Sequence, residues 1–452
     1  MIIKWLKGKK ADPSQESGKK TKASEGKQSP SCKKKPSAAK SPPSKKTKSR
    51  KNHRPTWDIN TFDVPRVEGK TRFHDLAIHI ELMQAIHKSG FDYCTPIQAE
   101  TLPHTLKGQD VIGKAQTGTG KTAAFLITVM DQLLCHPLES KRYLSEPRAL
   151  IIAPTRELVK QIEEDAKKLG QFSELSIVSL VGGEKFEKQE NQLQRGFVDI
   201  VVATPGRLID FVQQKKIYLD RVEILVLDEA DRMLDMGFIP QVKQIVRATP
   251  HKENRQTLLF SATFDQDIIN LSKQWTIDAY QIEVEAETVT TDNVEQISYM
   301  VADSDKVGMI ARLTREDDVK HCIIFTNRKD QSQTLYDKLI GLGCKVGILT
   351  GDIQQSKRTQ TLKQFKEGKV KVLIATDVVG RGIHIDGITH VINYNLPQEP
   401  ENYVHRIGRT GRAGAKGVAI NLIGEEDTYD VETLESYLGY KLDLKLPPEH
   451  LL

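Results

Sequence analysis

Short runs of β-branched and aliphatic residues recur along this chain, and most of them end in polar residues. A first series lies at residues 110–115, 149–154, 175–181, 199–205, 223–230 and 257–263. A second series lies at residues 321–327, 345–351, 370–377, 390–395 and 417–423. Helix-like stretches separate the runs, a pattern typical of parallel strands buried by helices on both faces. The sequence therefore predicts an α/β protein with a duplicated, doubly wound sheet whose ligands bind at the carboxyl ends of the strands.

The positive charge of the chain is concentrated at its N-terminus. Residues 1–56 hold 18 Lys or Arg and 3 Asp or Glu, whereas the remainder holds 48 basic and 57 acidic residues and so carries −9. Residues 8–56 are almost entirely Lys, Ser, Pro, Gly, Ala and Thr, a composition that cannot bury enough apolar surface to fold. We expect a disordered tail that attracts nucleic-acid phosphates, although a merely solvating extension has the same composition.

Several classes of protein are not indicated. No stretch approaches the roughly 20 apolar residues of a membrane span, and the apolar start of the chain is too short for the core of a secretory signal. The five cysteines form no CxxC pair, so neither a zinc site nor a disulfide framework is expected. We therefore expect a cytoplasmic protein without integral membrane segments.

A phosphate-binding loop follows the first predicted strand. The segment AQTGTGKT, residues 115–122, precedes the helical pattern TAAFLITVMDQLL. In this context Gly118 and Gly120 let backbone N–H groups surround phosphate oxygens, Lys121 reaches the β and γ phosphates, and Thr122 offers a hydroxyl to Mg²⁺. ATP and Mg²⁺ are the expected cofactors. The expected nucleotide contacts in this loop are Ala115, Gln116, Thr117, Gly118, Thr119, Gly120, Lys121 and Thr122.

An acidic motif ends a later predicted strand. Asp228 and Glu229 follow EILVL at residues 223–227. Asp228 is placed to hold Mg²⁺, and Glu229 to orient and deprotonate the attacking water. An acidic helix start has the same appearance, but its pairing with the phosphate loop favours the catalytic interpretation.

The tetrapeptide DEAD at residues 228–231, together with AQTGTGKT, resembles the DEAD-box family of ATP-dependent RNA helicases. The resemblance extends through PTREL, TPGRL, SAT, ATDVVGRG and HRIGRTGR, and it covers about residues 72–430. It implies two RecA-like domains joined by a hinge. The expected parts are a tail at 1–56, a first domain at 57–280, a linker at 281–296, a second domain at 297–435 and a short end at 436–452.

The same resemblance assigns further nucleotide contacts. In GFDYCTPIQ, residues 90–98, Gln98 would read adenine, Thr95 would support the loop, and Phe73 would stack on the base. In the second domain, Gly380 and His384 would lie near the ribose. His384 stands where most family members have an aspartate, so a single imidazole hydrogen bond would replace the two acceptors of a carboxylate at the ribose.

HRIGRTGR, residues 405–412, would bring cations to the nucleotide. Arg409 and Arg412 would act as arginine fingers, completing a catalytic set with Lys121, Asp228 and Glu229. His405 and Arg406 would connect this segment to Asp231, Ser261 and Thr263, and so couple the nucleotide state to the RNA state.

The resemblance also implies RNA contacts at the ends of predicted strands. Short hydroxyls, glycine N–H groups and arginines suit phosphate and sugar contacts rather than base reading. We therefore expect binding without sequence specificity. The expected RNA-binding residues are Thr155, Arg156, Gly183, Thr204, Gly206, Arg207, Arg232, Thr326, Gly351, Arg358 and Thr376.

The expected activity is ATP-driven local separation of short RNA duplexes by a monomeric core. An ATP-gated RNA clamp or scaffold and a DNA-translocating helicase are the alternatives. GFDYCTPIQAETLP and GRGIHIDGITHVINY resemble bacterial members associated with RNA-degrading complexes built on endoribonuclease E. That resemblance implies an RNA-decay protein as a partner, bound through the second domain.

Overall fold

A computed structural model describes residues 57–115, 118–137, 142–284, 293–377, 387–411 and 415–451. The expected disordered tail lies outside these ranges. So do five of the predicted nucleotide-site residues, namely Gln116, Thr117, Gly380, His384 and Arg412. Trp57–Leu452 forms one compact unit. Below, the first lobe is residues 57–284 and the second lobe is residues 293–451.

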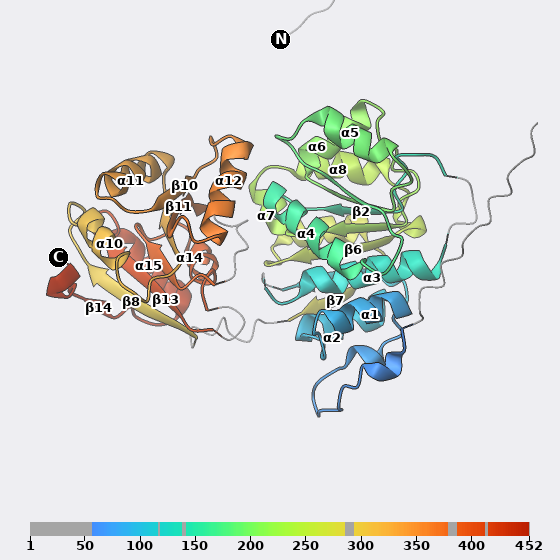
Figure 1. The fold of residues 1–452 in the computed structure, drawn as a ribbon, viewed down its shortest axis with the longest axis horizontal. Helices are drawn as coiled ribbons and strands as arrows, with labels where there is room; N and C mark the ends of the chain where they lie inside the picture. The colour runs from blue at the N-terminus through green and yellow to red at the C-terminus, as the bar shows by residue number, and fades with distance from the viewer. Residues whose placement is uncertain are drawn as a thin grey trace, which may run out of the picture. The chain divides into compact units, whose positions relative to one another are not determined.

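The first lobe is built on a parallel sheet of seven strands in the order β3-β4-β2-β5-β6-β1-β7. Figure 1 colours this lobe from blue to yellow. Its strands are β1 (Val111–Lys114), β2 (Ala149–Ile152), β3 (Ile177–Leu180), β4 (Ile200–Ala203), β5 (Ile224–Leu227), β6 (Gln256–Ser261) and β7 (Tyr280–Glu283). The first six confirm the first series of apolar runs. Every residue of β2, β4 and β5 is buried, as expected for strands covered by helices on both faces.

Two sets of helices cover the two faces of this sheet. One set is α1 (Ile80–Lys88), α2 (Pro96–Thr105), α3 (Lys121–Cys135) and α4 (Arg156–Leu169). The other contains α5 (Phe186–Gln194), α6 (Pro205–Gln213), α7 (Ala230–Asp235), α8 (Ile239–Ala248) and α9 (Gln266–Trp275). Ile151 packs with the first set, and its neighbours Leu150 and Ile152 pack with the second, because successive side chains of a strand point to opposite faces.

The second lobe repeats this architecture. Its sheet has the order β10-β11-β9-β12-β13-β8-β14, which is the order of the first sheet with each strand number raised by seven. The strands are β8 (Val294–Met300), β9 (Cys322–Thr326), β10 (Val346–Leu349), β11 (Val372–Thr376), β12 (His390–Asn393), β13 (Gly417–Ile423) and β14 (Leu444–Lys445). The described helices are α10 (Lys306–Leu313), α11 (Lys329–Gly341), α12 (Gln355–Lys366), α14 (Pro400–Ile407) and α15 (Thr428–Leu438). The predicted duplication is confirmed.

The linker prediction is wrong at both of its ends. Residues 281–283 belong to β7, and residues 294–296 begin β8. Val111 and Tyr280 are paired in register, so β7 is the edge strand of the first sheet beside β1. Only Ile282 of β7 is buried, which explains why this strand lacks a continuous apolar run. Residues 285–292 lie outside the described ranges.

Membrane insertion finds no support in the described part of the chain. None of its helices combines the length and the apolar character that a bilayer crossing requires.

Candidate nucleotide and RNA site

The phosphate loop connects the end of β1 to the start of α3. Gly118 and Gly120 have φ angles of 93° and 96°, a left-handed conformation that glycine adopts without strain. Lys121 is buried, and its Nζ donates a hydrogen bond of 2.5 Å to the carbonyl oxygen of Ala115. The lysine therefore lies across the loop, where its charge can meet phosphate oxygens.

Gln98 links the predicted adenine motif to the phosphate loop. Its Oε1 accepts a hydrogen bond from the Thr95 N–H at 3.0 Å, and its Nε2 donates to the Gly120 carbonyl at 3.1 Å. A Cβ atom at Gly120 would lie 2.6 Å from that Nε2 and would displace the carboxamide, and the positive φ of Gly120 would strain any other residue there. The carboxamide has donor and acceptor groups, as predicted for adenine recognition, and here both engage backbone atoms.

Phe73 does not present a ring to the cavity beside the phosphate loop. It is 1% exposed and packs in the core of the first lobe. Phe91, which is 47% exposed, lines that cavity of about 530 Å³ together with Gly118, Lys121 and Asp228. We predicted no role for Phe91 from the sequence, although its place within GFDYCTPIQ is a signal for one.

The acidic pair follows β5. Asp228 is 2% exposed and accepts a hydrogen bond from the Glu229 N–H at 3.0 Å. Burial raises the pKa of Asp228 to about 6, Lys121 opposes this shift, and the charge of Glu229 adds to it. Lys121 therefore acts electrostatically on the carboxylate predicted to hold Mg²⁺.

Glu229 is paired with an arginine that was predicted to bind RNA. Arg232 Nη1 lies 3.0 Å from Glu229 Oε2, and the two side chains are 8% and 10% exposed. In this structure Arg232 is thus buried against the candidate catalytic base rather than displayed to solvent. The sequence could not indicate this pairing, because (i, i+3) spacing at the start of a short helix is also typical of exposed residues.

Three of the predicted coupling residues are directly connected. The Asp231 N–H donates to Ser261 Oγ at 3.2 Å, and Asp231 Oδ2 accepts from the N–H groups of Ala262 and Thr263 at 2.9 and 3.2 Å. The loop after β5 and the loop after β6 are therefore joined through one carboxylate.

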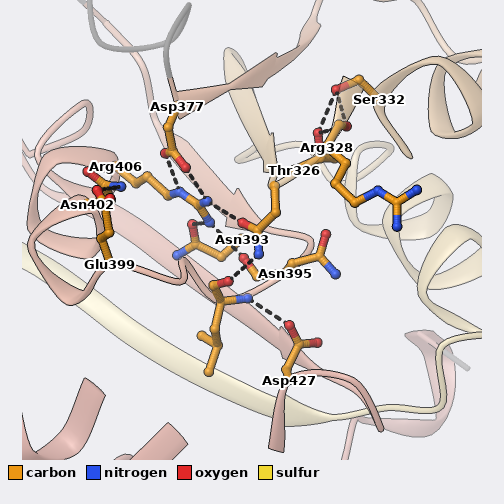
Figure 2. A network of polar contacts seen from close by, with 12 residues as sticks. Thr326, Arg328, Ser332, Asp377, Asn393, Asn395, Glu399, Asn402, Arg406 and Asp427 are labelled. Atoms are coloured by element: carbon orange, nitrogen blue, oxygen red, sulfur yellow. Dashed lines mark hydrogen bonds and ion pairs between the residues drawn. The ribbon is translucent and has the colours of Figure 1, made fainter. Parts of the chain in front are cut away.

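Arg406 was predicted to contact this connection, but it makes its contacts inside the second lobe (Figure 2). It is 1% exposed. Its Nε and Nη2 donate to both carboxylate oxygens of Asp377 at 2.6 Å. Its remaining N–H groups donate to Asn327 Oδ1, Asn393 Oδ1 and the Asn395 carbonyl at 2.7, 3.2 and 2.7 Å. All five guanidinium donors are used, so Arg406 organises the second lobe.

Arg409 and His405 line a cavity that also contains catalytic candidates. The volume is about 370 Å³, and the lining includes Lys121, Glu229, Asp231, Thr263, His405 and Arg409. Arg409 is buried, and its Nε donates to the His405 carbonyl at 3.1 Å. The structure thus brings Lys121, Glu229 and Arg409 together.

The predicted RNA contacts of the first lobe lie where its strands end. Thr155 follows β2 and begins α4, with its Oγ1 accepting from the Leu158 N–H at 3.3 Å. Thr204 stands between β4 and α6, and Gly183 (φ 78°) follows β3. Gly206 and Arg207 lie in the first turn of α6, where Arg207 Nη1 donates to the Glu184 carbonyl at 3.1 Å. These residues share the carboxyl edge of the parallel sheet.

The predicted RNA contacts of the second lobe fall into two groups, those at strand ends and those engaged with other side chains. Gly351 and Thr376 lie at the ends of β10 and β11. Thr326 is fully buried and hydrogen-bonds to Ser332 Oγ at 2.6 Å, so in this structure its hydroxyl is not accessible to RNA (Figure 2). Arg358 is ion-paired with Glu157 at 2.6 Å.

The oxygen donors at the phosphate loop suit Mg²⁺. Thr122 and Asp228 line one cavity and offer a hydroxyl and a carboxylate, and Mg²⁺ is usually held by one or two carboxylates together with substrate phosphates. Among the described residues, no group of three or more His, Cys, Asp or Glu could hold a metal without such help.

The fold and this site together define a class of protein. Tandem RecA-like sheets, with a phosphate loop in the first and an arginine-bearing helix end in the second, are those of a helicase-type ATPase. Residues 95–271 match the DEAD/DEAH box helicase model, and residues 305–414 match the helicase conserved C-terminal domain. The chain belongs to the DEAD-box family of ATP-dependent RNA helicases.

Individual proteins support this placement. The chain is 57% identical over 385 residues to ATP-dependent RNA helicase RhlB of Pseudomonas syringae, covering 85% of this chain and 97% of that protein. It is 43% identical to RhlB of Pectobacterium atrosepticum, covering 82% and 86%. Among solved structures, S. cerevisiae Dbp5 bound to RNA and ADP BeF3 matches with a TM-score of 0.73 and 33% identity, covering 84% of this chain and 96% of that one.

Proposed function

We propose that this helicase binds single-stranded RNA by its backbone and uses ATP hydrolysis to separate short duplexes locally. ATP and RNA would both favour a closed arrangement of the two lobes, so each would strengthen binding of the other. The bound strand would be bent in a way that a duplex cannot follow, and hydrolysis would release it.

The observation that carries this proposal is the cavity that contains Lys121, Glu229 and Arg409. Lys121 would neutralise the β and γ phosphates, and Glu229 would accept the proton of the attacking water. Arg409 would stabilise charge on the γ phosphate, as arginine fingers do. Mg²⁺, held through Thr122 and Asp228, would supply further charge neutralisation at the phosphates.

The path from RNA to the nucleotide would run through Asp231. Its carboxylate joins the loop that carries Glu229 to the N–H groups of Ala262 and Thr263. His405 lines the same cavity as Asp231 and Glu229. A movement of His405 or of the loop after β6 would therefore alter the surroundings of the catalytic base. The sheet edge that carries Thr155 and Thr204 would hold the RNA backbone.

Steady-state ATPase assays test the function directly. We expect single-stranded RNA to stimulate turnover, and single-stranded DNA of the same sequence to do so far less, because contacts with 2′-hydroxyl groups distinguish RNA. Equal stimulation by both polymers would indicate a DNA-active helicase. ATP-dependent RNA binding without turnover would indicate a clamp.

We further propose that the protein acts in the cytoplasm and assists RNA decay as a partner of an endoribonuclease E complex. The support is the similarity to proteins named RhlB, extending over 97% of the Pseudomonas protein. Affinity purification from the source cell, after ribonuclease treatment to remove RNA bridging, tests the partnership. A purified complex that contains no endoribonuclease would contradict the proposed partnership.

A further inference from the structure

We propose that Arg232 is a positioning residue that holds Glu229 in an unproductive orientation, and that an RNA phosphate releases Glu229 by taking over the Arg232 guanidinium. This inference rests on the proposed function, because it describes how RNA would regulate the same hydrolytic site. It differs from the sequence-based expectation, in which Arg232 served only to bind RNA.

The local backbone fixes the pair. Glu229 immediately precedes α7 and has φ 54° and ψ 55°, a left-handed conformation that is unusual for a residue with a side chain. Arg232 is the third residue of that helix, so its side chain returns toward Glu229. The resulting 3.0 Å contact is almost fully enclosed, and solvent screens it little. Arg232 therefore sets the direction of the Glu229 carboxylate.

The held carboxylate lies at the reaction site. Glu229 and Arg232 line the same cavity as Lys121 and Arg409. A base at this place must accept a hydrogen bond from the attacking water before it can take a proton. Glu229 Oε2 instead accepts from Arg232 Nη1, so the observed pair competes with that water.

The carboxyl edge of the sheet brings Arg232 close to the predicted RNA path. Ile152 of β2 is in register with Leu227 of β5. Arg156 follows the first by four residues, and Arg232 follows the second by five, so both lie beyond the same edge. Burial lowers the pKa of Arg358, and the charges of Arg156 and Arg232 lower it further. The three guanidinium groups therefore lie within electrostatic reach of one another.

Two of these arginines hold carboxylates of the protein itself. Glu157 pairs with Arg358, and Glu229 pairs with Arg232. Guanidinium groups bind phosphate in the same bidentate manner as carboxylate. Exchange of Glu229 for an RNA phosphate would leave Arg232 with an anionic partner and would avoid the cost of a buried, unpaired charge. After the exchange Arg232 would remain paired, and the Glu229 carboxylate would be available to water.

The test compares ATP turnover without RNA and across a titration with poly(U), for wild type and three variants. We expect Arg232→Gln to raise the RNA-free rate about fivefold, the factor that corresponds to the net contribution of one typical hydrogen bond. The RNA-saturated rate should stay within about twofold of wild type, so the stimulation factor falls. Arg232→Lys, which keeps the charge but loses the planar fork, should lie between. Arg247→Gln, on the exposed end of α8, is the matched control and should behave as wild type.

A purely structural or purely RNA-binding role gives a different pattern. If Arg232→Gln leaves the RNA-free rate unchanged or lowers it, the inference is wrong. If Arg232→Gln does not fold, as judged by circular dichroism, Arg232→Lys decides, and an unchanged RNA-free rate in that variant overturns the proposal. Absence of RNA stimulation in the wild type would instead contradict the proposed function.

Discussion

Glu229 is constrained by its backbone conformation, by its ion pair and by its neighbour in the sequence. Its backbone is left-handed, its carboxylate is paired with Arg232, and its neighbour Asp228 is buried. A left-handed conformation at a non-glycine residue costs on the order of 1–3 kcal/mol and is maintained only where the surroundings fix it. The hydrogen bonds of Asp231 to the loop after β6 provide such a fixed setting.

The role of Glu229 as general base predicts the behaviour of Glu229→Gln. The amide has nearly the same shape but cannot accept a proton, so we expect turnover to fall by about 100-fold or more. ATP-dependent RNA binding should persist, because the predicted nucleotide and RNA contacts remain. Parallel ATPase and fluorescence-anisotropy measurements check both expectations. Turnover close to that of the wild type would remove Glu229 from the mechanism.

At the scale of residues, sequence motifs predicted where site residues lie in the fold better than they predicted which residues those side chains contact. The phosphate loop and the acidic pair lie where their spacing placed them, because both follow strands directly. The burial of Phe73, the pairing of Arg232 and the enclosure of Arg406 depend on residues distant in sequence or on how a side chain turns. A single sequence without tertiary contacts does not contain that information.

At the scale of elements, the end of α14 is fixed by one guanidinium. Arg406 contacts Asn327 after β9, Asp377 after β11, and Asn393 and Asn395 at the end of β12. It therefore connects the carboxyl ends of three adjacent strands to the end of α14. Figure 2 shows its contacts with Asp377, Asn393 and Asn395. Arg409 follows three residues later, and its Nε donates to the carbonyl oxygen of His405 in α14.

This arrangement predicts a large effect of Arg406→Lys. Lysine has three donors and no planar fork, so buried acceptors would lose their partners. We expect the second lobe to lose about 3 kcal/mol of unfolding free energy, measured by urea denaturation. Arg328→Lys, in an exposed pair with Asp330, is the control and should cost less than about 1 kcal/mol. Equal effects of the two substitutions would contradict the assignment.

His390 of β12 predicts a pH dependence of the same lobe. Burial lowers its pKa, Asp318 and Glu316 oppose the shift, and Lys371 adds to it. The unfolded chain therefore binds the proton more readily, and the unfolding free energy falls as the pH drops below about 6.5.

We expect His390→Asn to lose less stability than the wild type between pH 7.5 and pH 5.5. Urea denaturation at the two pH values measures this difference. An identical decline in both proteins would mean that His390 does not contribute.

The strands were predictable to the extent that they are buried. Eleven apolar runs correspond to β1–β6 and β9–β13, since strands covered on both faces need continuous apolar sequence. β7 and β14 are edge strands with mostly exposed side chains, and neither has such a run. β8 was not predicted, because its first residues belong to an acidic segment that resembles a linker.

At the scale of the whole molecule, an acidic helicase core is joined to a strongly basic N-terminal segment. Residues 1–56 carry an excess of 15 positive charges, and the rest carries −9. Cations that approach nucleic acid release condensed counterions, so their contribution depends steeply on salt.

We predict that deletion of residues 1–56 weakens RNA affinity mainly at low salt and reduces the slope of log affinity against log salt concentration. Anisotropy titrations with one RNA from about 50 to 200 mM salt measure that slope. The ATPase rate at saturating RNA serves as control and should be retained. An unchanged slope would contradict a role of this segment in RNA binding.

The repeated strand order has a consequence for how the protein is made. Each sheet is complete within one contiguous half of the chain, so neither half has to wait for the other in order to fold. During translation, the half that carries Lys121 leaves the ribosome first and can close around its own core. A nascent chain at that stage would possess the phosphate cradle without Arg409, and premature ATP consumption by unfinished polypeptides would be avoided.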